Sequence, residues 1–157
     1  VNNPRLIIAD EPTTALDVTI QVQVIDVLRE INRLHGTAIL LISHNIGVIS
    51  DLCSRVLVMY AGRIVEDLDL QMLRSGPAHP YTQALISAIP DLETAKERAL
   101  ESIPGLPPEP GRLAPGCAFA PRCPKTVERC RIERPVLQAR SPTQRVACWV
   151  AMSAGEA

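Results

Sequence analysis

The sequence has few aromatic residues and almost no net charge. Aromatic side chains make up 3% of the 157 residues, and the formal net charge is −1. It has neither a basic stripe to follow a phosphate backbone nor a platform on which bases stack, so no nucleic acid partner is expected. No apolar run reaches the roughly 20 residues that a membrane-spanning helix needs. With 46% hydrophobic residues, the composition is typical of one globular domain plus an appended segment.

The first part of the chain, up to about residue 90, alternates between short apolar runs and amphipathic segments. The predicted strands cover residues 6–9, 38–42, 56–60 and 63–66. The predicted helices cover residues 18–34, 46–53, 68–73 and 81–89. Asp17 can cap the longest helix and Gly36 can end it. The alternation of strands and helices predicts an α/β fold whose early strands are parallel.

The second part, from about residue 90, is rich in proline and cysteine. A charged helix is expected over residues 91–102. Beyond it, nine prolines between positions 104 and 142 interrupt any regular element, so this part is expected to consist mostly of extended chain and turns. It also contains four of the five cysteines, and we expect it to have little core of its own.

Two acidic residues directly follow the first predicted strand. A single acid at this point is commonly a helix cap, but Asp10 and Glu11 are adjacent. Neighbouring side chains of a strand point to opposite sides, so one acid can hold a cation while the other faces a different point. The carboxyl ends of parallel strands line the crevice where α/β proteins bind ligands. The pair therefore suits phosphoryl transfer, with one Mg²⁺ ligand beside a group that orients or deprotonates the attacking water.

The stretch LIIADEPTTALDVT, residues 6–19, resembles the Walker B strand and following D-loop of ABC ATPases. The resemblance implies that Asp10 holds Mg²⁺ through water and that Glu11 is the general base. It also implies that Asp17 is the acid at the face where two ATP-binding domains meet around ATP.

One histidine follows the second predicted strand directly. A lone histidine is more often structural than catalytic, but His44 opens into the same crevice as Glu11 if the two strands are neighbours. Its spacing resembles that of the switch histidine of ABC ATPases, which contacts the γ-phosphate and links it to the glutamate. Asn45 stands where that family often has Asp.

Two further stretches resemble one branch of the family, the oligopeptide and dipeptide importers. Residues 59–66 resemble the hairpin after the switch region, although Asp67, Leu68 and Asp69 stand where a glycine-containing turn is usual. The segment HPYT, residues 79–82, resembles the C-terminal extension of this branch, and we interpret it as the turn before a helix with a packed ring. The resemblance implies that residues 1–76 belong to the ATP-binding domain and residues 77–157 to the extension.

Four cysteines in the second part have the spacing C-x5-C-x6-C-x17-C: Cys117, Cys123, Cys130 and Cys148. This is a poor pattern for a zinc ribbon, and an expected cytosolic compartment argues against disulfides. A [4Fe–4S] cluster needs four thiolates and tolerates irregular spacing. The importer branch carries a similar cysteine tail, and the resemblance implies such a cluster, with zinc and free thiols as alternatives. Arg122, Arg129 and Arg131 are expected to lower the thiol pKa values.

The sequence contains neither GxxxxGK[ST] nor LSGGQ, which an ABC ATPase carries ahead of its Walker B strand. We therefore expect the C-terminal portion of the ATP-hydrolysing subunit of a peptide importer, inactive alone and with one face of its sheet bare. The complete subunit would pair with a second ATPase subunit beneath membrane permease subunits, peripherally on the cytoplasmic face of the membrane. The alternative is a non-catalytic truncated product or a metal-bearing regulatory module. A permease-free ABC ATPase is a further alternative, against which HPYT and the cysteine tail argue.

Overall fold

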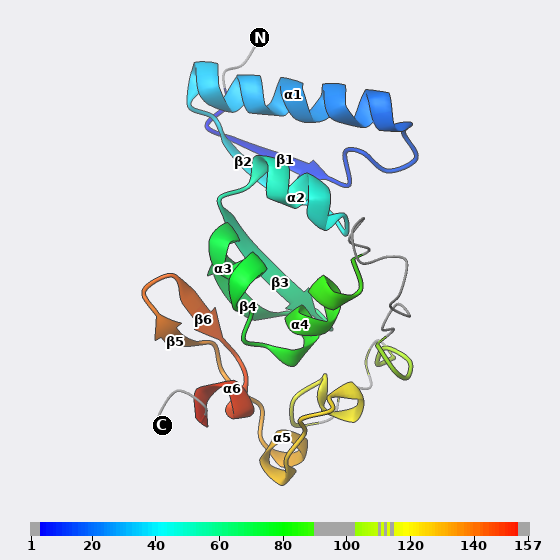
Figure 1. Ribbon diagram of the computed structural model, residues 1–157, viewed down its shortest axis with the longest axis vertical. Helices are drawn as coiled ribbons and strands as arrows, with labels where there is room; N and C mark the ends of the chain where they lie inside the picture. The colour runs from blue at the N-terminus through cyan, green and yellow to red at the C-terminus, as the bar shows by residue number, and fades with distance from the viewer. Residues whose placement is uncertain (1–3, 90–102, 110, 112, 114, 154–157) are drawn as a thin grey trace. The chain divides into compact units, whose positions relative to one another are not determined.

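The computed structural model describes residues 4–89, 103–109, 111, 113 and 115–153 (Figure 1). The predicted helix over residues 91–102 lies outside this part of the chain. The chain divides into two units, Val1–Ser54 and Arg55–Ala157. This division falls earlier in the chain than the domain boundary predicted at 76/77. That boundary is based on the resemblance of residues 77–157 to a C-terminal extension, and it stays a prediction.

The first unit contains two parallel strands and two helices. In chain order these are β1 (Leu6–Asp10), α1 (Val18–His35), β2 (Ala38–Ile42) and α2 (Ile46–Leu52). β1 pairs with β2 in parallel, and Asp10 at the end of β1 lies opposite Ile42 at the end of β2. The predicted strands, the long helix and the adjacency of the two strands are thereby confirmed.

Helix α1 begins and ends where the local residues predict. Asp17 precedes it in extended conformation, and its Oδ1 accepts a hydrogen bond from the Ile20 N–H at 3.0 Å. Gly36 follows it in the left-handed region, with φ of 64°, and its N–H donates to the Asn32 carbonyl. A left-handed residue after a helix is inexpensive for glycine and costly for most other residues.

The two faces of the β1–β2 sheet differ in burial. On one face Ala9 packs with Ile25 and Leu28 of α1 and with Val48 of α2, forming the core of this unit. On the other face the apolar side chains are substantially exposed: Leu6 51%, Ile8 62%, Leu40 44% and Ile42 46%. This agrees with the expectation of a bare sheet face, since a buried parallel sheet normally has apolar cover on both sides.

The second unit is built on an antiparallel sheet with the strand order β3-β4-β6-β5. Its strands are β3 (Arg55–Tyr60), β4 (Arg63–Asp69), β5 (Gln138–Ser141) and β6 (Gln144–Val146). Its helices are α3 (Leu70–Ser75), α4 (Pro80–Ser87), η1 (Ala120–Arg122), α5 (Glu128–Ile132) and α6 (Trp149–Ser153). The α/β class is confirmed, in the form of one parallel and one antiparallel sheet.

The β3–β4 hairpin closes as its turn residues predict. Ala61 and Gly62 both have positive φ, 49° and 74°. Two such residues form the mirror-image turn whose twist matches that of paired strands. β4 extends to Asp69, so Asp67, Leu68 and Asp69 are strand residues here.

The cysteine-rich segment is buried by residues from elsewhere in the chain, as expected of a segment with little core of its own. β6 pairs with β4, Val146 lies opposite Glu66, and Val146 is completely buried. Phe119 is 1% exposed and packs against Tyr60 and Tyr81, with ring centroids 5.2 and 5.4 Å away. Prolines limit regular structure locally, but a distant strand and distant rings supply the core.

Candidate functional site

The acid pair and the histidine meet at the carboxyl ends of β1 and β2. The Nδ1 atom of His44 lies 2.8 Å from Oε1 of Glu11. A carboxylate only accepts hydrogen bonds, so Nδ1 carries the proton in this contact. The Glu11 N–H also donates to the Ile42 carbonyl at 2.9 Å, which extends the parallel pairing by one residue. The structure thus brings together the two residues that the sequence assigned to one crevice.

Glu11 adopts a backbone conformation that is unusual for a residue with a side chain. Its φ is 47°, in the left-handed region, where non-glycine residues are uncommon and strained. The side-chain direction therefore follows from this turn and not from the alternation of the strand. Thr14 stabilises the turn, because its hydroxyl donates to Oε2 of Glu11 at 2.6 Å and its N–H donates to the Glu11 carbonyl.

The same contacts keep Glu11 ionised. The hydrogen bond from Thr14, and next that from His44, holds the pKa of the Glu11 carboxyl below its ordinary value of 4.5. Hydrogen bonds to the charged form of an acid favour that form. At neutral pH the site therefore presents a carboxylate whose two oxygens are both oriented. A side chain that positions and deprotonates water needs these properties.

The other candidate residues of this unit are exposed, and two of them act as helix caps. Asp10 is the last residue of β1 and is exposed. Asp17 is exposed and caps α1. Asn45, which replaces the usual Asp, caps α2 by accepting from the N–H groups of Gly47 and Val48. An aspartate would cap in the same way, so this departure leaves the local structure intact.

The four tail cysteines line one small cavity in the second unit. Around it lie Cys117, Cys123, Cys130, Cys148, His79, Pro80, Phe119, Ala120, Pro135, Trp149 and Val150. Cys117 reaches this position because its N–H donates to the Cys130 carbonyl at 2.8 Å. Gly116 permits that approach, since a Cβ there would stand 2.2 Å from the Cys130 oxygen. Cys148 joins them because it lies two residues after the end of β6, which pairs with β4.

The expectation that arginines lower the thiol pKa values is wrong. Burial, and to a lesser extent the charges of neighbouring cysteines, raises the pKa of Cys117, Cys123 and Cys148. Two of these three arginines have other partners. Arg122 donates to Tyr60 and to two backbone carbonyls, and Arg129 pairs with Glu133 while lying 3.6 Å above the Trp149 ring.

Among the described residues, no group of three or more His, Cys, Asp or Glu side chains is arranged to hold a metal ion. The cysteines therefore share a cavity without forming a ready single-ion site.

The HPYT segment has the structural role expected of it. His79 precedes α4, and its Nδ1 accepts from the Tyr81 N–H at 3.0 Å. Its ring is 1% exposed, and its centroid lies 5.9 Å from that of Phe119. Burial lowers the pKa of His79 to about 4, so the ring is neutral at physiological pH.

Sequence reasoning missed the role of Glu66. This side chain is completely buried and accepts hydrogen bonds from the N–H groups of Ala78 and His79, at 2.7 and 3.1 Å. It also accepts from Nε2 of Gln144 in β6, at 2.8 Å. Glu66 thus ties β4 to β6 and to the turn before α4. The available signal was an acid after Ile64 and Val65, at the end of the predicted strand over residues 63–66, which by itself does not reveal its partners.

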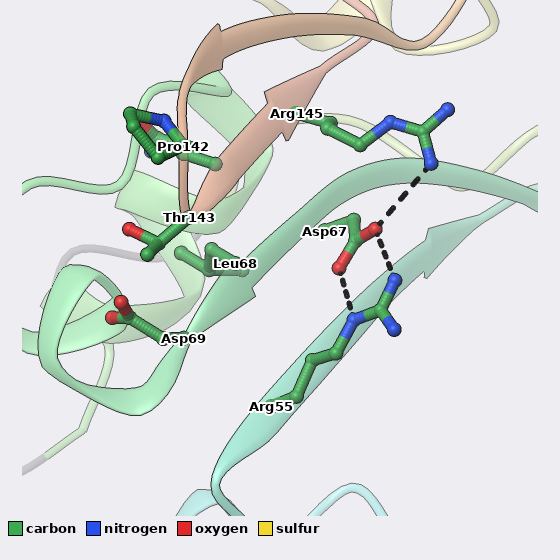
Figure 2. A pocket seen from close by; sticks show the side chains of 8 residues that line it. Arg55, Asp67, Leu68, Asp69, Pro142, Thr143 and Arg145 are labelled. Atoms are coloured by element: carbon green, nitrogen blue, oxygen red, sulfur yellow. Dashed lines mark hydrogen bonds and ion pairs between the residues drawn. The ribbon is translucent and has the colours of Figure 1, made fainter.

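A second cavity lies beside β3, β4 and β6 (Figure 2). Its central group is Asp67, which receives two hydrogen bonds from Arg55, at 2.8 and 2.6 Å, and has Arg145 at 3.8 Å. Hydrogen bonds from Arg55, with the positive charges of both arginines, lower the pKa of Asp67 although the residue is only 5% exposed. The Asp67 carboxylate on β4 thus links a side chain of β3 to a side chain of β6.

Comparisons with known proteins identify relatives along nearly the whole chain. It is 46% identical over 147 residues to a probable peptide ABC transporter ATP-binding protein of Sinorhizobium fredii, covering 94% of this chain and 44% of that protein. It is 45% identical over 148 residues to an oligopeptide transport ATP-binding protein of Bacillus subtilis, covering 94% and 45%. A dipeptide transport ATP-binding protein of Escherichia coli is 46% identical over 134 residues, covering 85% and 41%.

The chain is therefore a homologue of the ATP-binding proteins of ABC transporters. Within that class its relatives are oligopeptide and dipeptide transport proteins, and residues 65–130 match the family described as the oligopeptide/dipeptide transporter, C-terminal region. The resemblance inferred from the sequence is confirmed. The chain spans less than half the length of these relatives. In the part of the chain that the structure describes, no helix is long and apolar enough to cross a membrane.

Proposed function

We propose that this chain forms the C-terminal portion of the ATP-hydrolysing subunit of a peptide ABC importer. The observation that carries the proposal is the 2.8 Å contact between Glu11 and His44 at the ends of two parallel strands. Strand ends of this kind are where α/β proteins bind their ligands. The relatives, whose names describe peptide transport and ATP binding, support the same assignment.

Each site residue has a separate part in this proposal. Asp10 would hold Mg²⁺, which would supply positive charge next to the transferred phosphoryl group. Glu11 orients the attacking water and takes its proton. His44 holds Glu11 through Nδ1–H and presents its other nitrogen to the γ-phosphate. The strained backbone at Glu11 favours this assignment, because such strain is concentrated at functional sites.

The proposed partners follow from the same family assignment. A second ATPase subunit meets the face that carries Asp17, so that ATP lies between the two. Membrane permease subunits bind the assembly at the cytoplasmic face, where the subunit is peripheral. The exposed apolar face of the β1–β2 sheet supports the proposal that further protein covers this unit. Apolar surface without cover remains at four side chains, those of Leu6, Ile8, Leu40 and Ile42.

The function is tested by peptide uptake in cells that carry or lack the gene for the complete subunit. We expect uptake of a radiolabelled peptide to be lost on deletion and restored by the wild-type gene. Uptake of an unrelated sugar in the same cells is the control for general energy loss. Peptide uptake that continues unchanged after deletion would contradict the proposal.

We further propose that the cysteine cavity holds a [4Fe–4S] cluster, with Cys117, Cys123, Cys130 and Cys148 as ligands. Two observations favour it: four thiols line one cavity, and the same cavity is lined by a buried histidine with an unpartnered nitrogen. Burial and mutual charge raise the thiol pKa values, and a cationic cluster core would offset both effects. When bound, the cluster would supply a cross-link for the segment and a one-electron redox centre.

The cluster proposal predicts iron in anaerobically purified protein. We expect brown protein with iron and sulfide, and we expect Cys130→Ala to lose the colour and most of the iron, because Cys130 is a buried ligand. Cys53→Ala is the matched control, since Cys53 belongs to the first unit and is not among the residues that line this cavity. The measurement is visible absorption with metal analysis on the same samples. Zinc without iron would contradict the cluster but keep the cross-link, and four freely titrating thiols would contradict both.

A further inference from the structure

One ring nitrogen of His79 has no hydrogen-bond partner although it is buried. The Nδ1 atom accepts from the Tyr81 N–H, and a backbone N–H only donates. Nδ1 therefore offers a lone pair, and the neutral ring carries its proton on Nε2. That Nε2–H group is a buried donor without an acceptor. Buried donors of this kind are rare in folded proteins and call for an explanation.

The surroundings of His79 indicate what the missing acceptor is. The residue lines the cavity that all four tail cysteines also line. None of these sulfur atoms is its partner in the chain as described, since Nε2 is without a hydrogen bond. An acceptor inside the cavity, bound by the cysteines, would satisfy the Nε2–H group. An iron–sulfur cluster bound by the cysteines offers two kinds of acceptor, thiolate sulfur and inorganic sulfide.

His79 is not placed to act as a metal ligand itself. Ligation through Nε2 would need a lone pair on that atom, but the hydrogen bond to Tyr81 already requires the lone pair on Nδ1. A neutral imidazole has only one such nitrogen. The Glu66 carboxylate also holds the backbone N–H of His79 at 3.1 Å, so the ring is attached at a well-defined point. The histidine is therefore restricted to donating a hydrogen bond.

We propose that His79 donates a hydrogen bond from Nε2–H to a sulfur atom of the cluster held by Cys117, Cys123, Cys130 and Cys148. The inference rests on the iron–sulfur part of the proposed function. His79 is a positioning residue that acts on the electronic state of the cluster. Hydrogen bonds to cluster sulfurs stabilise the more negative, reduced state and raise the reduction potential. The HPYT segment would thus both start α4 and adjust the redox centre.

Two substitutions separate the two roles of the ring. In His79→Asn, the side-chain oxygen can still cap α4, but the side chain is too short to place a donor at the position of Nε2. In His79→Gln, the amide nitrogen extends about as far as Nε2 and restores a donor. Thr82→Val is the matched control, because Thr82 is equally buried on α4 with an unpartnered hydroxyl and does not line the cavity.

The experiment measures iron content, midpoint potential and pulsed EPR of the reduced protein labelled with ¹⁵N-histidine. We expect equal iron in all four proteins. The midpoint should be more negative in His79→Asn, close to wild type in His79→Gln, and unchanged in Thr82→Val. The ¹⁵N coupling should be present in the wild type and in Thr82→Val, and lost in both His79 variants.

Three results would overturn the inference, and they are distinguishable. Equal iron with the same midpoint in every variant would remove the role of His79 and leave the cluster. A shift in Thr82→Val as large as that in His79→Asn would assign the effect to packing in α4. Wild-type protein without iron would overturn the cluster proposal and this inference together.

Discussion

Replacing Glu11 by glutamine in the complete subunit is expected to leave ATP bound but to lower steady-state hydrolysis by about 10²–10⁴-fold, the usual contribution of a general base. Glutamine preserves the shape of the side chain and one acceptor for Thr14 or His44. It cannot take a proton from water, because an amide is not basic. In the wild type, the hydrogen bonds from Thr14 and His44, at 2.6 and 2.8 Å, each need one oxygen of the carboxylate, and glutamine provides only one oxygen.

The measurements for this variant are ATP hydrolysis and equilibrium binding of Mg²⁺-ATP on the same preparation. Glu30→Gln is a suitable control, because it makes the same glutamate-to-glutamine change at an exposed position on α1 that is not part of the site. It should hydrolyse ATP at the wild-type rate. Near-normal hydrolysis by Glu11→Gln would show that the base lies elsewhere, whereas loss of ATP binding would indicate a structural role for Glu11.

Replacing Glu66 by glutamine is expected to lower the free energy of unfolding of the second unit by about 2–4 kcal/mol, since each buried donor left unpaired costs about 1–3 kcal/mol. Glu66 accepts from the N–H groups of Ala78 and His79 and from the Gln144 amide. Glutamine keeps one accepting oxygen but puts an NH₂ donor where the other stood. At least one buried donor then faces another donor.

Urea unfolding followed by the fluorescence of Trp149 measures this effect, because Trp149 is the single tryptophan and belongs to the second unit. Glu128→Gln is the control, since Glu128 is exposed on α5 and a surface change of this kind is usually within about 0.5 kcal/mol. An unfolding midpoint for Glu66→Gln that matches the control would mean that the buried network contributes little to stability.

Much of the first unit was predictable because its signals are local. The apolar runs at 6–9 and 38–42 are short and bounded, and the helix between them has a cap at Asp17 and a left-handed stop at Gly36. Parallel pairing of β1 with β2 then places Glu11 beside His44 without further information. The left-handed backbone of Glu11 was not predictable, because the residues themselves disfavour it and only the surrounding turn holds it.

By itself, the sequence determined the class of protein, the position of the acid pair and the histidine, and the number of thiols. Only the tertiary structure decided that the thiols share one cavity, because β6 brings Cys148 into place by pairing with β4, far away along the chain. It also reversed the expected direction of the thiol pKa shifts, since burial raises the thiol pKa values while Arg122 and Arg129 are engaged with other partners. Charge and burial depend on contacts between distant segments, whereas periodicity and capping depend on neighbours within a few residues.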